Sequence, residues 1–228
     1  MPRVRQNNNW RTAAAYNPQG SGCSSFYWLP PLAVLLFGAL IAMAAAHMPS
    51  QAAAFQGGST SPSNGLASLF TPEVQYWSAA ILRWSGDSNL DPNLVGTIMQ
   101  IESCGNAAAR SSVGAMGLFQ VMPDHFAVTD DPYDPDTNAL RGLAYLQRVF
   151  DLSNHDISWS LAAYNGGPGL IGLNEGMWPA ETIRYVYWGS GIYADATGMK
   201  AGSQRLSEWL AAGGASLCQR AHQQLDLP

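Results

Sequence analysis

From Thr71 to the C-terminus, apolar residues recur at the spacing of amphipathic helices. Val74, Trp77, Ile81 and Trp84 form the first series. Helix-start signals, in which a capping residue precedes a proline or a polar first turn, recur along this part of the chain: Thr71-Pro72-Glu73, Asp91-Pro92, Asp136-Thr137-Asn138, Asp156 and Trp178-Pro179. No segment alternates apolar and polar residues for long, so the pattern predicts an all-α domain.

The apolar stripes of the later helices can also be assigned from their spacing. The third predicted helix presents Leu140, Leu143, Tyr145, Leu146 and Phe150, the fourth presents Trp159, Leu161 and Tyr164, and the last presents Tyr185 and Tyr187. We expect these residues to pack into one core.

The N-terminal part has a different character. No charged residue occurs in 24–46, the run 32–46 is continuously apolar or small, and only arginines (Arg3, Arg5, Arg11) carry charge before it. This pattern predicts a membrane-targeting segment whose N-terminus lies inside. The small residues Ala44 and Ala46 favour a cleaved signal peptide, whereas the long preceding tail favours a retained anchor, so both readings stay open. A buried core helix would leave the arginine-only flank unexplained.

These features divide the chain into four regions. We predict a cytoplasmic tail at 1–25, a transmembrane anchor or signal peptide at 26–48, a Ser-, Gly- and Pro-rich linker at 49–70, and one folded domain at 71–228. The folded domain would then lie outside the cytoplasmic membrane, either anchored to it or secreted.

Charge and histidine placement exclude several classes of function. All 16 acidic residues but only eight of the 11 basic ones follow residue 71, so the folded part has a net charge of −8 and no basic run. Nucleic acid is therefore not an expected partner. His47, His125, His155 and His222 lack metal-ligand spacing, so the sequence predicts no metal and no other cofactor.

Cys104 and Cys218 are the cysteines that follow the membrane segment. In an oxidising compartment they would form one disulfide that closes a loop of more than 100 residues. Two free buried thiols are the alternative, because sequence does not show whether their Cα atoms approach one another.

Glu102 is the strongest catalytic candidate. Leu94, Val95, Ile98 and Met99 form the apolar stripe of the second helix, and Glu102 lies on the same side of its last turn. Burial raises the pKa of a carboxyl group, and a glutamate that holds its proton near neutral pH suits general-acid cleavage of a glycosidic bond. A glutamate that only caps the following loop is the structural alternative.

Several motifs accompany Glu102 in a fixed order. They are the Glu102-Ser103 pair, the block G-A-x-G-L-x-Q-x-M-P at 114–123, D-P-x-D-P-x-x-N at 131–138, G-L-x-Y-L at 142–146, A-Y-N-G-G-P-G at 163–169 and E-T-x-x-Y-V at 181–186. This set resembles the catalytic domain of soluble-type lytic transglycosylases over about residues 71–196. The last 32 residues are not covered by the resemblance.

The resemblance implies a lysozyme-like fold of the goose-type and lytic transglycosylase kind, with peptidoglycan as substrate. It also implies that Glu102 is a single acid/base that cleaves the bond after N-acetylmuramic acid and forms a 1,6-anhydro ring without water. Carried over by motif, six residues would contact or shape the glycan site: Ser111, Gln120, Met122, Tyr164, Asn165 and Glu181. Tyr164 would lie near the catalytic glutamate.

Departures from the family pattern remove no reacting group. Phe119 stands where methionine is common, Gly167 follows Gly166 where an alanine-glycine pair is common, and Cys104 lies two residues after Glu102.

Two other functions remain possible from the sequence. The first is a hydrolase of muramidase or chitinase type, which would share Glu102 and use a second carboxylate, from Asp124, Asp130, Asp131 or Glu181, to position water. The other is a catalytically inactive glycan-binding module, against which the intact Glu102 argues.

Overall fold

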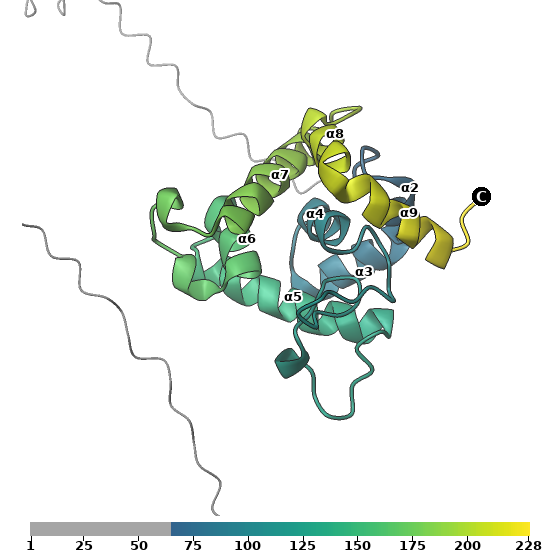
Figure 1. Ribbon diagram of the computed structural model, residues 1–228, viewed down its shortest axis with the longest axis horizontal. Coiled ribbons are helices and arrows are strands. Elements are labelled where there is room, and N and C mark those ends of the chain that lie inside the picture. Colours follow the sequence, from purple (N-terminus) through teal and green to yellow (C-terminus); the bar gives the residue numbers. More distant parts are fainter. Residues whose placement is uncertain (1–64) are drawn as a thin grey trace, which may run out of the picture. The chain divides into compact units, whose positions relative to one another are not determined.

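The computed structural model describes residues 65–228, and the elements keep the labels of Figure 1. The order is α2 (Pro72–Tyr76), α3 (Ser78–Ser88), α4 (Pro92–Glu102), η1 (Pro123–His125), α5 (Pro135–Leu152), α6 (Ile157–Gly166), η2 (Pro168–Leu170), η3 (Glu175–Met177), α7 (Ala180–Thr197), α8 (Gln204–Trp209), the π-helical turn η4 (Leu210–Gly214) and α9 (Ala215–Gln224). Two isolated β-bridges, Arg110 with Met116 and Met116 with Val121, are the β structure of this part. The expectation of an all-α domain is confirmed for the described residues.

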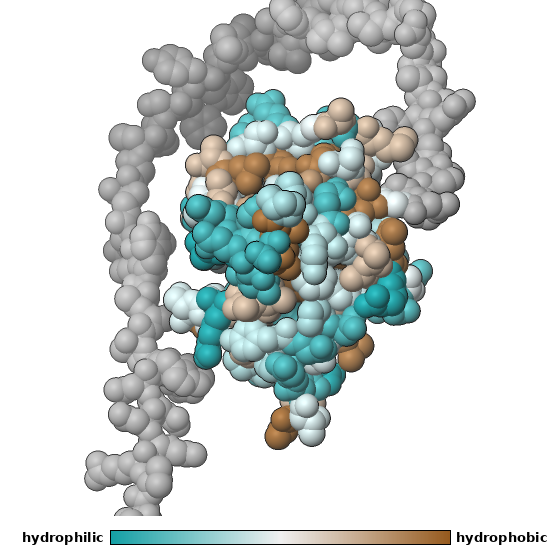
Figure 2. Space-filling model, turned by 90° about the vertical axis from the view of Figure 1, so that its right-hand side faces the viewer, coloured by the Kyte–Doolittle hydropathy of each residue, from teal (hydrophilic) through white to brown (hydrophobic). Residues whose placement is uncertain are grey.

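Helix α4 lies at the centre of the domain (Figure 1). It packs against α2, α3 and α7, while α6 packs against both α5 and α7. Val95, Ile98 and Met99 have no solvent exposure, because the apolar stripe of α4 is enclosed by these neighbours. On the face drawn in Figure 2, apolar residues reach the surface only as patches interrupted by hydrophilic ones.

The folded domain begins before Thr71. Leu69 is 8% exposed and Phe70 is 3% exposed, and both belong to the core, although the sequence places them in the linker. The start of the folded domain shifts because the apolar side chains at the end of the Ser- and Gly-rich stretch pack against α4. The predicted tail at 1–25 and the predicted membrane segment at 26–48 lie outside the described residues. Among the helices of residues 65–228, none combines the length and the apolar character needed to cross a bilayer.

Three details of the predicted helices are corrected. The first series is two helices, α2 and α3, separated at Trp77, whose indole Nε1 donates to the carbonyl of Gly105 at 2.8 Å. Helix α5 begins two residues earlier than expected, because the side chain of Asp134, rather than that of Asp136, accepts the capping hydrogen bond, from the amide of Thr137. Leu140 is 63% exposed instead of buried, because the buried face of α5 is formed by Ala139, Leu143, Leu146 and Val149. Trp159 and Tyr187, which the sequence pattern also places in the core, are 37% and 50% exposed.

A long irregular segment between α4 and α5 is fastened by one buried amide. Asn138 on α5 accepts from the amide of Phe119 at 2.9 Å and donates to the carbonyls of Met116 and Pro132. Gly117 has φ +75°, and a Cβ there would overlap the Asn138 amide. Glycine is therefore required at this point, and the segment is held in place on the side of the domain where α4 ends.

A disulfide joins the end of α4 to α9. Cys104 and Cys218 are bonded, with their Cα atoms 5.0 Å apart and a sequence separation of 114. Gln100, which is fully buried, donates its amide to both sulfurs, at 3.1 and 3.5 Å. The residues after the region of resemblance thus pack against the helix that carries Glu102.

Candidate active site

Glu102 is the last residue of α4, and the helix presents its side chain to a cleft. Asp91 caps the start of α4 by accepting from the amide of Asn93 at 2.7 Å, and Pro92 occupies the first turn. The hydroxyl of Tyr185, on α7, donates to Glu102 Oε1 at 2.8 Å. The packing of α4 against α7 therefore fixes the orientation of the carboxyl group.

The surroundings of Glu102 favour its protonated form. Although part of the side chain faces the cleft, burial raises the pKa of Glu102 to about 7. The hydrogen bond from Tyr185 opposes this shift, and the negative charge of Glu181 adds to it. A carboxyl group with this pKa is able both to donate and to accept a proton near neutral pH.

Tyr185 is the functional residue that sequence reasoning missed. The sequence places Tyr164 near the glutamate, and Tyr164 does lie close enough to be affected by the charge of Glu102, but its hydroxyl donates to the carbonyl of Phe119 at 2.8 Å rather than to the carboxyl group. Burial and the nearby charge of Glu102 raise the pKa of both tyrosines well above the usual value, so both remain donors. Tyr185 lies four residues after Glu181, and this helical spacing is the signal that would have found it.

Two adjoining pockets form the cleft. The first, which we call the glutamate pocket, has a volume of about 290 Å³ and is lined by Ile101, Glu102, Asn165, Glu181, Arg184, Tyr185 and Trp188. The second, the tyrosine pocket, has a volume of about 220 Å³ and is lined by Gln120, Val121, Met122, His125, Gly142, Tyr145, Tyr164, Asn165 and Gly167. Asn165 lines both, so the pockets meet beside α6. The cleft therefore continues from the glutamate pocket past Asn165 into the tyrosine pocket.

Six of the seven predicted site residues line these pockets. Gln120, Met122 and Tyr164 line the tyrosine pocket, Glu102 and Glu181 line the glutamate pocket, and Asn165 lines both. Ser111 is not among the lining residues of either. Its hydroxyl accepts from the amide of Ala115 at 2.9 Å, within the turn that precedes Met116.

Aromatic rings not assigned to the site by sequence extend the tyrosine pocket. His125 and Tyr145 have ring centroids 4.9 Å apart, and Tyr145 and Tyr164 have centroids 5.6 Å apart. Such rings provide flat apolar surfaces with polar edges, which suit the faces of sugars.

Of the four acids considered as a second carboxylate, Glu181 lies in the same pocket as Glu102. Asp130 is paired with Arg141 at 2.7 Å, and this contact holds the pKa of Asp130 below its usual value. Asp131 accepts from the amide of Tyr133, and Asp124 is exposed in η1. Glu181 is therefore the acid that stays relevant to the hydrolytic alternative.

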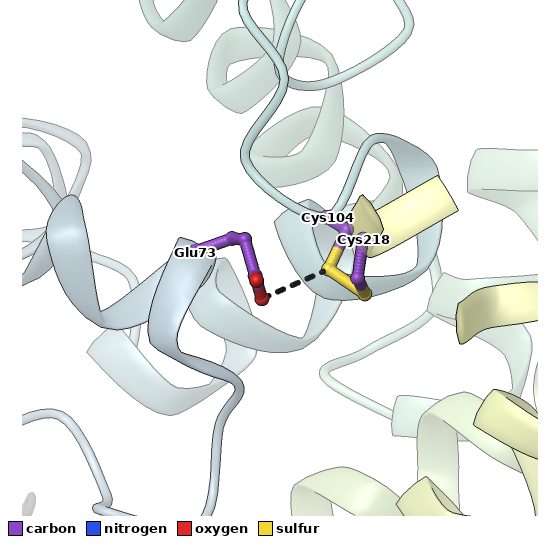
Figure 3. A group of neighbouring side chains, drawn as sticks. All are labelled: Glu73, Cys104 and Cys218. Atoms are coloured by element: carbon purple, nitrogen blue, oxygen red, sulfur yellow. Dashed lines mark hydrogen bonds between the residues drawn. A yellow bond between two sulfur atoms is a disulfide. The ribbon is translucent and has the colours of Figure 1, made fainter. Parts of the chain in front are cut away.

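One cluster of potential metal ligands occurs among the described residues. Glu73, Cys104 and Cys218 have ligand atoms within 4.8 Å of one another (Figure 3). His222 Nδ1 contacts the Glu73 carboxylate at 3.0 Å. Because the two sulfurs are bonded to each other, neither offers a thiolate to a metal. The cluster instead joins α2, the end of α4 and α9.

The comparisons with known proteins agree with this geometry. The family model described as Transglycosylase SLT domain matches residues 79–179. Residues 79–179 are therefore similar to a transglycosylase SLT domain. The matched segment begins in α3 and ends just before α7, so it contains Glu102 and the lining residues of the tyrosine pocket.

Relatives of the matched segment are named as transglycosylases. A "Transglycosylase" of Enterobacteria phage PRD1 is 40% identical over 115 residues, which are 49% of this chain and 40% of the phage protein. A "Soluble lytic murein transglycosylase" of Escherichia coli is 32% identical over 101 residues, which are 39% of this chain and 16% of the relative. The alignments thus cover less than half of either relative.

Solved structures similar to this chain include an inactive mutant of lytic transglycosylase Slt from Pseudomonas aeruginosa. It shares 26% identity, with a TM-score of 0.40, over 66% of this chain and 24% of that chain. The 70 kDa soluble lytic transglycosylase of Escherichia coli has 24% identity and the same TM-score, over 61% and 25% of the two chains.

The Tyr185 hydrogen bond leads to a testable prediction for this chain. Tyr185→Phe removes the donor that stabilises the carboxylate, so the pKa of Glu102 should rise and the alkaline limb of the pH–rate profile should move to higher pH. The maximal rate should fall on the order of tenfold, because the carboxyl group loses a fixed orientation.

The measurement is the initial rate of glycan cleavage against pH. As a control, Tyr76→Phe on α2 changes an exposed tyrosine outside both pockets and should leave the alkaline limb at its wild-type position. An unshifted limb in Tyr185→Phe would contradict the assigned contact.

Proposed function

We propose that this chain is a peptidoglycan lytic transglycosylase in which Glu102 acts as the single acid/base. The observation that carries the proposal is a carboxyl group with a pKa of about 7 in a pocket that adjoins a second one at Asn165, within a segment that matches the transglycosylase SLT domain. The name of the Escherichia coli relative, a soluble lytic murein transglycosylase, supports the same substrate class.

In the first step Glu102 protonates the oxygen that leaves C1 of N-acetylmuramic acid, and the glycosidic bond breaks. The acetamido group of the same sugar stabilises the positive centre at C1. The Glu102 carboxylate then removes the proton from the 6-hydroxyl of that sugar, whose oxygen bonds to C1 and closes the 1,6-anhydro ring. Glu102 ends the cycle protonated, and no water is consumed. A pKa of about 7 suits both steps, since neither protonation state is costly to reach.

Tyr185 and the cleft residues have supporting roles in this proposal. Tyr185 positions the Glu102 carboxyl group, and Asn165, held by a hydrogen bond from Thr182 at 2.8 Å, lies where it can contact sugars in both pockets. Gln120, Met122 and Tyr164 line the binding site on one side of the broken bond, and Glu181 lines it on the other. Ser111 acts through the turn that holds Met116.

The proposed place of action is the cell envelope, outside the cytoplasmic membrane. Peptidoglycan lies there, and a disulfide of this kind is typical of an oxidising compartment. The segment 26–48 would take the domain there, as a retained anchor or as a signal peptide.

A hydrolytic muramidase is the second candidate, because Glu181 shares a pocket with Glu102. In that reaction Glu181 would hold a water molecule that attacks C1. Against this role, Glu181 is exposed on the first turn of α7, and solvent there weakens its control of a single water.

Mass spectrometry of digested peptidoglycan separates these functions. We expect muropeptides with 1,6-anhydro ends, each lighter by one water than the hydrolytic product. Glu181→Gln should still give anhydro ends if Glu102 works alone. Products with reducing ends, lost in Glu181→Gln, would establish the hydrolase, and binding without release would establish a glycan-binding module.

A further inference from the structure

A separate polar pocket lies where α7 and α8 run side by side, beyond the segment matched by the SLT model (Figure 1). Its volume is about 560 Å³, larger than either pocket of the cleft. The lining side chains that carry functional groups are Tyr187, Asp195, Lys200, Gln204, Arg205 and Glu208. None of these has a part in the reaction described above.

Arg205 is held in a fixed position in this α7–α8 pocket. Its guanidinium lies 3.6 Å from the centre of the Tyr187 ring, and its Nη1 donates to Glu208 at 3.0 Å. The Tyr187 hydroxyl donates to the same Glu208 carboxylate at 3.0 Å. A Cβ on Gly191 would approach Arg205 Cγ and Nε at 2.7 Å, so the arginine crosses α7 where the helix lacks a side chain. A guanidinium held in this way is prepared to bind a carboxylate.

The pocket offers both signs of charge. Lys200 pairs with Asp195 at 2.6 Å, so two cations and two carboxylates surround the same space. Partly exposed ion pairs contribute little to stability. A carboxylate of a ligand can therefore replace Glu208 as the partner of Arg205. The Glu208 carboxylate is then free to pair with an ammonium group of the same ligand. This arrangement suits a ligand that carries carboxylate and amino groups together. It does not suit a bare sugar, because Arg205 covers one face of the Tyr187 ring.

The position of the pocket relates it to the cleft. Arg184 and Trp188 line the glutamate pocket, and Gly191 and Asp195 follow them along α7 at helical spacing. The rise from Arg184 to Gly191 is about 10 Å. A substituent on a sugar bound at Glu102 can therefore reach the α7–α8 pocket.

We propose that the α7–α8 pocket binds the peptide stem of peptidoglycan, through Arg205 and Lys200 to its carboxylates and through Asp195 and Glu208 to its free amino group. The inference rests on the proposed function for its substrate, because the stem is attached to the muramyl residue that Glu102 would cleave.

A rate comparison on two substrates tests the proposal. Full-length wild type and Arg205→Ala are assayed on native peptidoglycan and on the same glycan after an amidase has removed the stems. We expect the ratio of the native rate to the stem-free rate to fall about fivefold to tenfold in Arg205→Ala. Gly191→Ala, which displaces the same guanidinium, should lower the ratio in the same direction. Arg220→Ala, which changes an exposed arginine of α9 outside the pocket lining, should leave the ratio unchanged.

A binding measurement keeps this inference distinguishable from the proposed function. A free synthetic stem peptide, titrated into full-length wild type and followed by NMR, should bind weakly, with a Kd on the order of 1 mM, and Arg205→Ala should weaken it about tenfold. Binding with this Arg205 dependence supports the inference even if the wild type releases no anhydro products, a result that would overturn the proposed function alone. Absence of peptide binding, or peptide binding that Arg205→Ala leaves unchanged, would overturn the inference. In an active enzyme, so would a rate ratio that Arg205→Ala leaves unchanged.

Discussion

Replacing Glu102 by glutamine should reduce peptidoglycan cleavage below about a hundredth of the wild-type rate while glycan binding persists. The amide has nearly the shape of the carboxyl group and still accepts from Tyr185, but it cannot deliver a proton to the leaving oxygen or take one from the 6-hydroxyl. Because the proposed mechanism assigns both steps to one group, we expect no other residue to compensate. Anhydro-muropeptide release and sedimentation with purified peptidoglycan measure the two properties separately.

The same variant has a predicted effect on stability with a definite sign. Folding raises the pKa of Glu102 from 4.5 to about 7, so between these values the folded state binds more protons than the unfolded state. Wild-type stability should therefore fall as pH rises through this window, and Glu102→Gln should not share the loss. The melting temperature of Glu102→Gln, relative to that of the wild type, should therefore increase between pH 4.5 and pH 7.

Glu175→Gln provides a matched control for both effects. Glu175 is an exposed glutamate of η3 that lines neither pocket of the cleft. Glu175→Gln should cleave peptidoglycan at the wild-type rate, and its melting temperature should vary with pH as that of the wild type does. Retained activity in Glu102→Gln would exclude the single-acid mechanism.

Capping residues and apolar spacing in the sequence correctly predicted helix starts and the side of α4 that carries Glu102. Asp91-Pro92 and Asp156 mark helix starts where the structure has capping hydrogen bonds, and the spacing from Val95 and Ile98 placed Glu102 on the packed side of α4. Leu140 shows the limit of this reasoning. Periodicity tells which residues share a face, but the neighbouring helices determine which face is buried.

The partners of Glu102 were harder to foresee, because they depend on the packing of distant segments. Tyr164 and Tyr185 both belong to motifs of the sequence, 62 and 83 residues after the glutamate. Only the packing of α4 against α7 decides that Tyr185 reaches the carboxyl group. Ser111 differs for a related reason, since its hydroxyl bonds within its own turn instead of facing the pockets.

Breaking the bridge between Cys104 and Cys218 should lower the free energy of unfolding by about 4 to 5 kcal/mol in the chain-entropy view, given its 114-residue separation. That is a large share of the 5–15 kcal/mol that stabilises a typical domain. Cys218→Ser and reduction of the wild type should both lower the melting temperature. Cys23→Ser, which removes a cysteine outside the bridge, should not.

The bridge should also affect catalysis below the melting temperature. Cys104 lies two residues after Glu102, and the disulfide ties this end of α4 to α9. Without it the carboxyl group should lose some of its fixed position, and errors near 1 Å are costly in rate. We therefore expect Cys218→Ser to cleave peptidoglycan more slowly than Cys23→Ser at temperatures where both remain folded. Thiol labelling of denatured, unreduced Cys23→Ser tests the premise: no reactive thiol is expected, and two would show that the bridge is absent and that both effects must fail.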